Sequence, residues 1–153
     1  MSVTHTLTAA VLGAGLGVQV FLSFMVAPAT FQLVERGTAV RLMEGLFPGY
    51  YAFGLATTAL ALVFALGLAV RGRGSLRWGV VFLLVLLLAG TVYAGGVLLP
   101  QAHAARLRAQ TAPAGDLAPL DFSRLHRWAM VVNIALCGVG AVALVLHAAA
   151  RPR

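Results

Sequence analysis

Polar side chains that could bind a ligand lie near the ends of several apolar stretches in this sequence. Hydrocarbon holds no water to satisfy such groups, so a polar residue inside or beside a membrane segment is a candidate for function. Arginine can hold an anionic group such as a lipid phosphate, and histidine can take up or release a proton near neutral pH. The candidate ligand-binding cluster selected on this basis is Arg36, Phe47, Pro48, Tyr50, Arg106, His126, Arg127 and Asn133.

A structural interpretation of the same cluster competes with binding. The arginines near these ends could form ion pairs with Glu35, Glu44 and Asp121. Tyrosine and tryptophan rings beside them commonly seat helices at the level of the lipid headgroups. In that interpretation the cluster is a cap at the membrane interface and binds nothing.

Metal chemistry is the second functional alternative. His126 and Met130 are four residues apart and would share one helical face, while His103 lies on another segment. Imidazole and thioether groups suit haem iron or copper. A haem- or copper-linked redox protein with His126, His103 and Met130 as ligands is therefore kept as an alternative.

Sequence signatures of common enzymes are missing. The chain has no H-E-x-x-H, no C-x-x-C, no phosphate-binding glycine loop and no nucleophile elbow. Cys137 is the single cysteine and lies in an apolar run, which favours a buried packing residue. These features favour a non-enzymatic binding or transport-associated protein over an enzyme.

The elements that must position these residues are membrane helices. Of 153 residues, 61% are hydrophobic and only 10% are charged, and the mean hydropathy is +0.94, a composition far from that of soluble domains. A helix needs about 20 apolar residues to cross a bilayer. The sequence therefore predicts an all-α membrane protein, one antiparallel bundle of four transmembrane helices over residues 1–153, with spans at about 7–33, 47–70, 78–99 and 128–149.

Prolines and small residues refine this prediction. Phe47-Pro48 suits the start of the second helix, because a proline at the first helical position lacks an N–H that would be unpaired anyway. Pro28 and Pro100 are expected to bend the first and third helices near their ends. Small-residue faces such as Gly13-x-x-x-Gly17 predict close helix packing, and they support a third hypothesis of a helix-packing subunit or a homo-oligomer.

Arginine positions predict the orientation. All 11 basic residues are arginine, and five of them flank the predicted 71–77 loop and the carboxy terminus without any acidic residue. Because cytoplasmic segments carry an excess of basic residues, both termini are predicted to be cytoplasmic. His5 and His147 fall at this end and are interpreted as interfacial residues. The arginines form no continuous basic stripe, so a nucleic-acid partner is not expected, whereas membrane lipid is.

Several ordered blocks of the sequence resemble the transmembrane protein 205 family, whose bacterial members form a domain-of-unknown-function family. The resemblance spans about residues 10–145, and it implies a four-helix protein of the bacterial inner membrane without an established activity. A more distant similarity to the copper-resistance protein D group and to haem-associated membrane oxidases implies metal or haem chemistry. The blocks that carry the family resemblance are Phe21-x-x-Phe24-x-x-Ala27-Pro28-x-x-Phe31, Arg36, Leu46-Phe47-Pro48-x-Tyr50-Tyr51, Leu99-Pro100 with Arg106, and Phe122-x-x-Leu125-His126-Arg127 with Asn133.

Overall fold

The computed structural model describes residues 3–72, 74–113 and 116–150, and regular structure in these ranges is helical throughout. Four continuous helical rods are long and apolar enough to cross a membrane, which confirms the predicted all-α membrane fold. Two of the rods contain a short π-helical segment. The elements are α1 (Val3–Phe21), the π-helix η1 (Leu22–Val26), α2 (Ala27–Leu33), α3 (Arg36–Arg71), α4 (Ser75–Tyr93), the π-helix η2 (Ala94–Leu98), α5 (Leu99–Thr111) and α6 (Ala118–Ala149).

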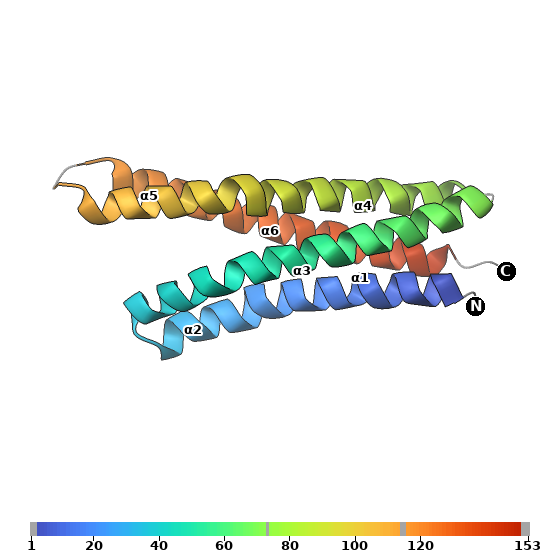
Figure 1. Cartoon of the computed structure of the whole chain (residues 1–153), viewed down its shortest axis with the longest axis horizontal. Helices are drawn as coiled ribbons and strands as arrows, with labels where there is room; N and C mark the ends of the chain where they lie inside the picture. The colour runs from blue at the N-terminus through green and yellow to red at the C-terminus, as the bar shows by residue number, and fades with distance from the viewer. Residues whose placement is uncertain (1–2, 73, 114–115, 151–153) are drawn as a thin grey trace.

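The rods run up and down and form an elongated bundle (Figure 1). α1 packs on α3, α3 on α4, α4 on α6, and α6 closes the ring against α1. Buried alanine, valine and leucine side chains fill the centre, among them Ala61, Val80, Leu84 and Ala143. Both described ends of the chain lie at one end of the bundle, which we call the terminal end. The opposite end, which holds Pro28, Pro48 and Pro100, is called the proline end.

The start of the second rod differs from the prediction. Pro48 lies inside α3, so the prediction that this helix begins at Phe47-Pro48 is wrong. The helix begins upstream because the Glu35 carboxylate caps it, accepting the backbone N–H of Gly37 at 2.9 Å and of Thr38 at 3.1 Å. These bonds satisfy N–H groups that every helix start leaves without a partner. Pro48 then costs the helix one backbone hydrogen bond, which the long regular helix around it tolerates.

The other two prolines lie beside π-helical turns, which is a local change of helix type rather than the predicted bend. η1 directly precedes the turn that holds Pro28, and η2 directly precedes the turn that holds Pro100. In both places a backbone N–H reaches back five residues, from Ala27 to the carbonyl of Leu22 and from Leu99 to that of Ala94. The wider turn makes room for the proline ring, which would otherwise collide with the carbonyl four residues earlier.

Close packing depends on different glycines from those expected on the first helix. A Cβ atom at Gly13 or Gly17 would meet nothing within 4 Å, whereas one at Gly15 would lie 2.5 Å from the Thr57 hydroxyl. The predicted Gly13/Gly17 contact face is therefore wrong, because an added Cβ on the helix face that these two glycines share would touch none of the described residues. Gly95 of η2 is a true contact, since a Cβ there would lie 2.9 Å from the Tyr51 ring.

Candidate functional site

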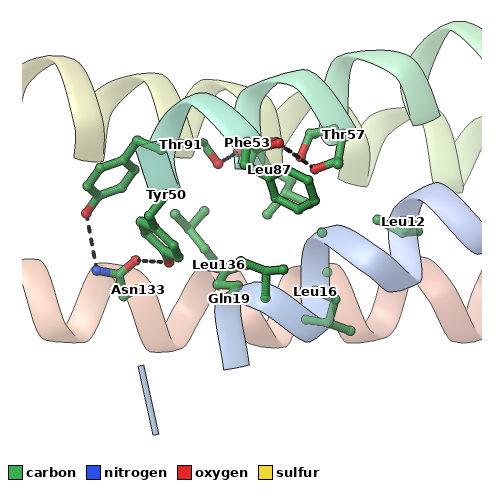
Figure 2. A pocket seen from close by; sticks show the side chains of 16 residues that line it. Leu12, Leu16, Gln19, Tyr50, Phe53, Thr57, Leu87, Thr91, Asn133 and Leu136 are labelled. Carbon is green, nitrogen blue, oxygen red and sulfur yellow. Dashed lines mark hydrogen bonds between the residues drawn. The ribbon is translucent and has the colours of Figure 1, made fainter. Parts of the chain in front are cut away.

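A small pocket lined by both polar and apolar side chains lies between the four rods, near the middle of the bundle (Figure 2). Its cavity volume is about 20 Å³, which is room for one or two water molecules. Every rod contributes side chains, and none of the lining residues is charged. The pocket is lined by Leu12, Gly15, Leu16, Val18, Gln19, Tyr50, Tyr51, Phe53, Gly54, Thr57, Thr58, Leu87, Thr91, Asn133, Leu136 and Gly140.

One asparagine joins two consecutive tyrosines at the edge of this pocket. The Tyr50 hydroxyl donates to Oδ1 of Asn133 at 3.1 Å, and Nδ2 of Asn133 donates to the Tyr51 hydroxyl at 3.4 Å (Figure 2). Both tyrosines are buried, and their rings meet edge to face with centroids 4.8 Å apart. The side chains of Gln19 and Ser23 lie close to the Tyr50 hydroxyl. This network therefore links the first rod, α3 and α6 through polar groups in an apolar bundle.

Threonine hydroxyls give the pocket further hydrogen-bond acceptors. The Thr57 hydroxyl donates to the Phe53 carbonyl at 2.9 Å, and the Thr91 hydroxyl donates to the Leu87 carbonyl at 2.8 Å. Because each proton is used within its own helix, the oxygen lone pairs stay available to another donor. The pocket thus offers hydroxyl and amide groups and suits an uncharged polar group.

The pocket reaches the outer surface of the bundle between α1 and α3. Two of its lining side chains are exposed there, Val18 of α1 at 38% and Phe53 of α3 at 41%. In a membrane-spanning bundle this surface faces lipid. A molecule dissolved in the bilayer would therefore have access to the pocket from the side.

A separate ion-pair cluster joins α3 to α5 nearer the proline end. Oε1 of Glu44 contacts Nδ1 of His103 at 2.8 Å and also pairs with Nη2 of Arg106. The pairing of Arg106 with an acidic residue was one of the predicted contacts. Glu35, by contrast, caps α3, and the backbone N–H groups of Gly37 and Thr38 lower the pKa of its carboxyl group below the usual value.

The structure divides the predicted candidate cluster into three parts. Tyr50 and Asn133 are bonded to each other, and Phe47 packs against Tyr50 with ring centroids 6.4 Å apart. Arg106 belongs to the Glu44 ion-pair cluster. The four remaining members are exposed and do not line the pocket, with His126 stacked on the ring of Phe122; they are Arg36, Pro48, His126 and Arg127.

Comparison with known proteins places the chain in a family. A family model described as "Domain of unknown function (DUF4149)" matches residues 10–111. The chain belongs to the DUF4149 family. The match covers the pocket walls formed by α1, α3 and α4, while Asn133 on α6 lies beyond it.

A relative of this DUF4149 protein is an uncharacterised protein of Aquifex aeolicus (strain VF5). The two are 35% identical over 82 residues, which is 54% of this chain and 60% of the relative. The match therefore covers less than two thirds of the relative's length. No solved structure matches this chain.

The three residues of the metal alternative in this DUF4149 protein have different surroundings. His103 bonds to Glu44 of α3, whereas His126 stacks on Phe122 and Met130 is exposed. Within residues 3–72, 74–113 and 116–150, no group of three or more histidine, cysteine or acidic side chains could hold a metal ion.

Two features of the DUF4149 structure were missed in the sequence. Tyr51 shares Asn133 with Tyr50, although only Tyr50 was selected. His5 and His147, interpreted from the sequence as interfacial residues, are buried between the rods at 4% and 3% exposed. The pair joins the first and last rods, and its signal in the sequence was that both histidines fall at the same end of the bundle.

Proposed function

We propose that this DUF4149 protein is a non-enzymatic membrane bundle that binds the uncharged polar end of a lipid-soluble molecule, or assists its transport. The site is the pocket beside Tyr50, Tyr51 and Asn133. One observation carries the proposal, namely that a hydrogen-bonded polar pocket inside the bundle reaches the lipid-facing surface. The proposal keeps the binding role predicted from the sequence and assigns it to the pocket rather than to the exposed arginines.

The chemistry of the lining supports an uncharged group. An anion would need a cationic partner in this low-dielectric setting, and a cation would need a carboxylate. The lining residues supply hydroxyl and amide groups instead. Since the cavity holds only one or two non-hydrogen atoms, a hydroxyl or carbonyl group fits, and the remainder of the molecule would lie along Val18 and Phe53 in the lipid.

The membrane that holds the protein, and the orientation of the protein in it, belong to the same proposal. We place the protein in the bacterial inner membrane with both termini in the cytoplasm, on the basis of the acid-free arginines at the terminal end. The pocket would then lie near the middle of the bilayer. A closer relationship to the transmembrane protein 205 family is likewise a proposal, supported by the ordered blocks that include Ala27-Pro28 and Phe47-Pro48.

Photolabelling tests the proposed site. The protein is reconstituted into phospholipid vesicles with a long-chain alcohol that carries a diazirine near its hydroxyl, irradiated, and mapped by mass spectrometry. We expect the label on peptides that contain Val18 and Phe53. Asn133→Leu removes the amide at similar volume and should lower this labelling at least about fivefold, the equivalent of one net hydrogen bond of about 1 kcal/mol.

Ser123→Ala is the matched control, because it removes a polar group from α6 outside the pocket and should leave labelling unchanged. Tyr50→Phe should lower labelling in the same direction as Asn133→Leu. Label spread evenly over all lipid-facing helices, or unchanged by both pocket variants, would refute the proposed site.

A further inference from the structure

A second cavity lies at the terminal end and shares no lining residue with the pocket beside Tyr50. Its volume is about 30 Å³, which is room for two water molecules or a small ion. All four rods contribute to it. The lining residues are His5, Ala65, Leu68, Arg77, Val80, His147 and Ala150.

Two buried histidines form one wall of this cavity. Nε2 of His5 lies 3.0 Å from the backbone carbonyl of His147, and Nε2 of His147 lies 3.0 Å from that of His5. The rings stack with centroids 4.0 Å apart. Since a carbonyl oxygen only accepts hydrogen bonds, each ring uses Nε2–H as the donor, and any added proton enters at Nδ1.

Arg77 brings a fixed positive charge to the same cavity. Its Nη1 donates to the Leu68 carbonyl at 3.1 Å, and the guanidinium packs over Gly72, where an added Cβ would overlap it. One bond uses one of five N–H donors. In the part of the chain that the structure describes, no carboxylate pairs with Arg77, since the ion pairs there involve Glu44 alone. A partly buried guanidinium without a counter-charge favours the approach of an anion.

We infer that this cavity is a binding site for a small inorganic anion of about the size of chloride. Arg77 supplies the charge that attracts the anion, and its remaining N–H groups supply the hydrogen bonds. The cavity is too small for a phospholipid headgroup with its glycerol and chains. The inference concerns a different site and a charged ligand, so it stands independently of the function proposed above.

The histidine pair makes the affinity depend on pH. α1 contributes His5, α3 contributes the apolar Ala65 and Leu68, α4 contributes Arg77, and α6 contributes His147. Protonation of one imidazole adds a second positive charge to the cavity, and an anion offsets it. Two stacked imidazolium rings would repel each other, so one proton is taken up with the anion. Affinity therefore rises as the pH falls.

Chloride binding to the purified full-length protein in an uncharged detergent tests the inference, measured as ³⁵Cl NMR line broadening during a sodium chloride titration. We expect saturable broadening that becomes stronger as the pH is lowered. Arg77→Gln keeps a donor for the Leu68 carbonyl and should weaken chloride binding at least about tenfold. Arg71→Gln, which removes an exposed arginine at the same end, is the matched control and should bind as the wild type does.

Ala65→Val provides a second variant that leaves every charge in place. It fills the cavity and should reduce binding as Arg77→Gln does, so the inference remains testable if Arg77→Gln fails to fold. Absence of saturable broadening in the wild type overturns the inference. Equal loss in Arg77→Gln and Arg71→Gln also overturns it, because the chloride would then be attracted to surface charge.

Discussion

The two ends of the bundle are built differently from the same four rods. At the terminal end α1 packs on both α3 and α6, and the buried histidine pair ties the first rod to the last. At the proline end α2 packs on α3, and in Figure 1 the α2–α3 pair diverges from the α5–α6 pair. The Glu44 ion-pair cluster spans the two pairs there.

The contrast between the two ends indicates where the bundle opens most readily. Buried apolar contacts and buried hydrogen bonds hold the terminal end, whereas π-turns, prolines and partly exposed charges shape the proline end. Regions with fewer buried contacts open more readily than the tightly packed regions of the same protein. The pocket beside Tyr50 lies near the middle of the bundle, between these two regions.

Removing one histidine of the buried pair should produce the largest loss of stability. His147→Ala takes away stacked ring contacts and leaves the His5 carbonyl without its donor, which we expect to cost about 2–3 kcal/mol. The measurement is unfolding of the purified protein followed by circular dichroism. His126→Ala, at an exposed histidine of the same helix, should cost less than about 0.5 kcal/mol. If both substitutions lowered the free energy of unfolding equally, the terminal end would not be the better anchored end.

Adjacent glycines in η2 offer a matched pair for the pocket wall. Gly95→Val would press a side chain into the Tyr51 ring and should cost about 1–3 kcal/mol through overpacking. Gly96→Val adds the same side chain where nothing lies within 4 Å, so only the change in helix propensity remains. Two measurements should distinguish Gly95→Val from Gly96→Val. One is the free energy of unfolding in detergent, and the other is photolabelling of the pocket by the long-chain alcohol. Indistinguishable variants would show that Gly95 does not position Tyr51.

The ion-pair cluster at the proline end should contribute little. A double-mutant cycle with Glu44→Gln and Arg106→Gln is expected to give a coupling free energy of about 0.5–1 kcal/mol, as for other partly exposed pairs. The coupling should shrink at high salt because the charges are accessible to ions. A coupling larger than the effect of His147→Ala would mean that the proline end is the better anchored of the two.

The cap of α3 should give the smallest effect, a loss of folding stability at acidic pH. Hydrogen bonds from Gly37 and Thr38 hold the pKa of Glu35 below its ordinary value of 4.5. A lowered folded pKa means that the carboxylate stabilises the fold above pH 4.5, and this contribution is lost as the pH falls through the folded pKa. Glu35→Gln should lack that part of the decline when unfolding is followed against pH. An identical acid decline in wild type and variant would contradict the cap's role.

The fold was predictable because it rests on composition and on the length of apolar runs, both of which are local properties. The residues at which helices begin were harder to predict. The Glu35 cap starts α3 twelve residues before Pro48, so the proline does not mark the start of the helix. Gly15 was overlooked in favour of Gly13 and Gly17, because the sequence does not say which face of a helix meets its neighbour.

The candidate site was predictable only in part. Tyr50 and Asn133 were selected for their polarity, but their bond joins positions 83 residues apart and depends on the register of two packed rods. Tyr51 was not selected, although consecutive helical residues point in different directions, and only the place of Asn133 on α6 brings one amide to both hydroxyls. The arginines were assigned to ligand binding by charge, which does not reveal whether a guanidinium faces the bundle or its surroundings.

Hydrogen–deuterium exchange of the protein in lipid nanodiscs, with and without the long-chain alcohol, examines the two ends and the pocket in one experiment. We expect faster exchange in η1, α2, η2 and α5 than in the terminal end, and slower exchange on adding alcohol in the peptides that line the pocket around Gln19 and Tyr50. Equal exchange at the two ends, together with no protection by the alcohol, would refute both the difference between the ends and the proposed binding site.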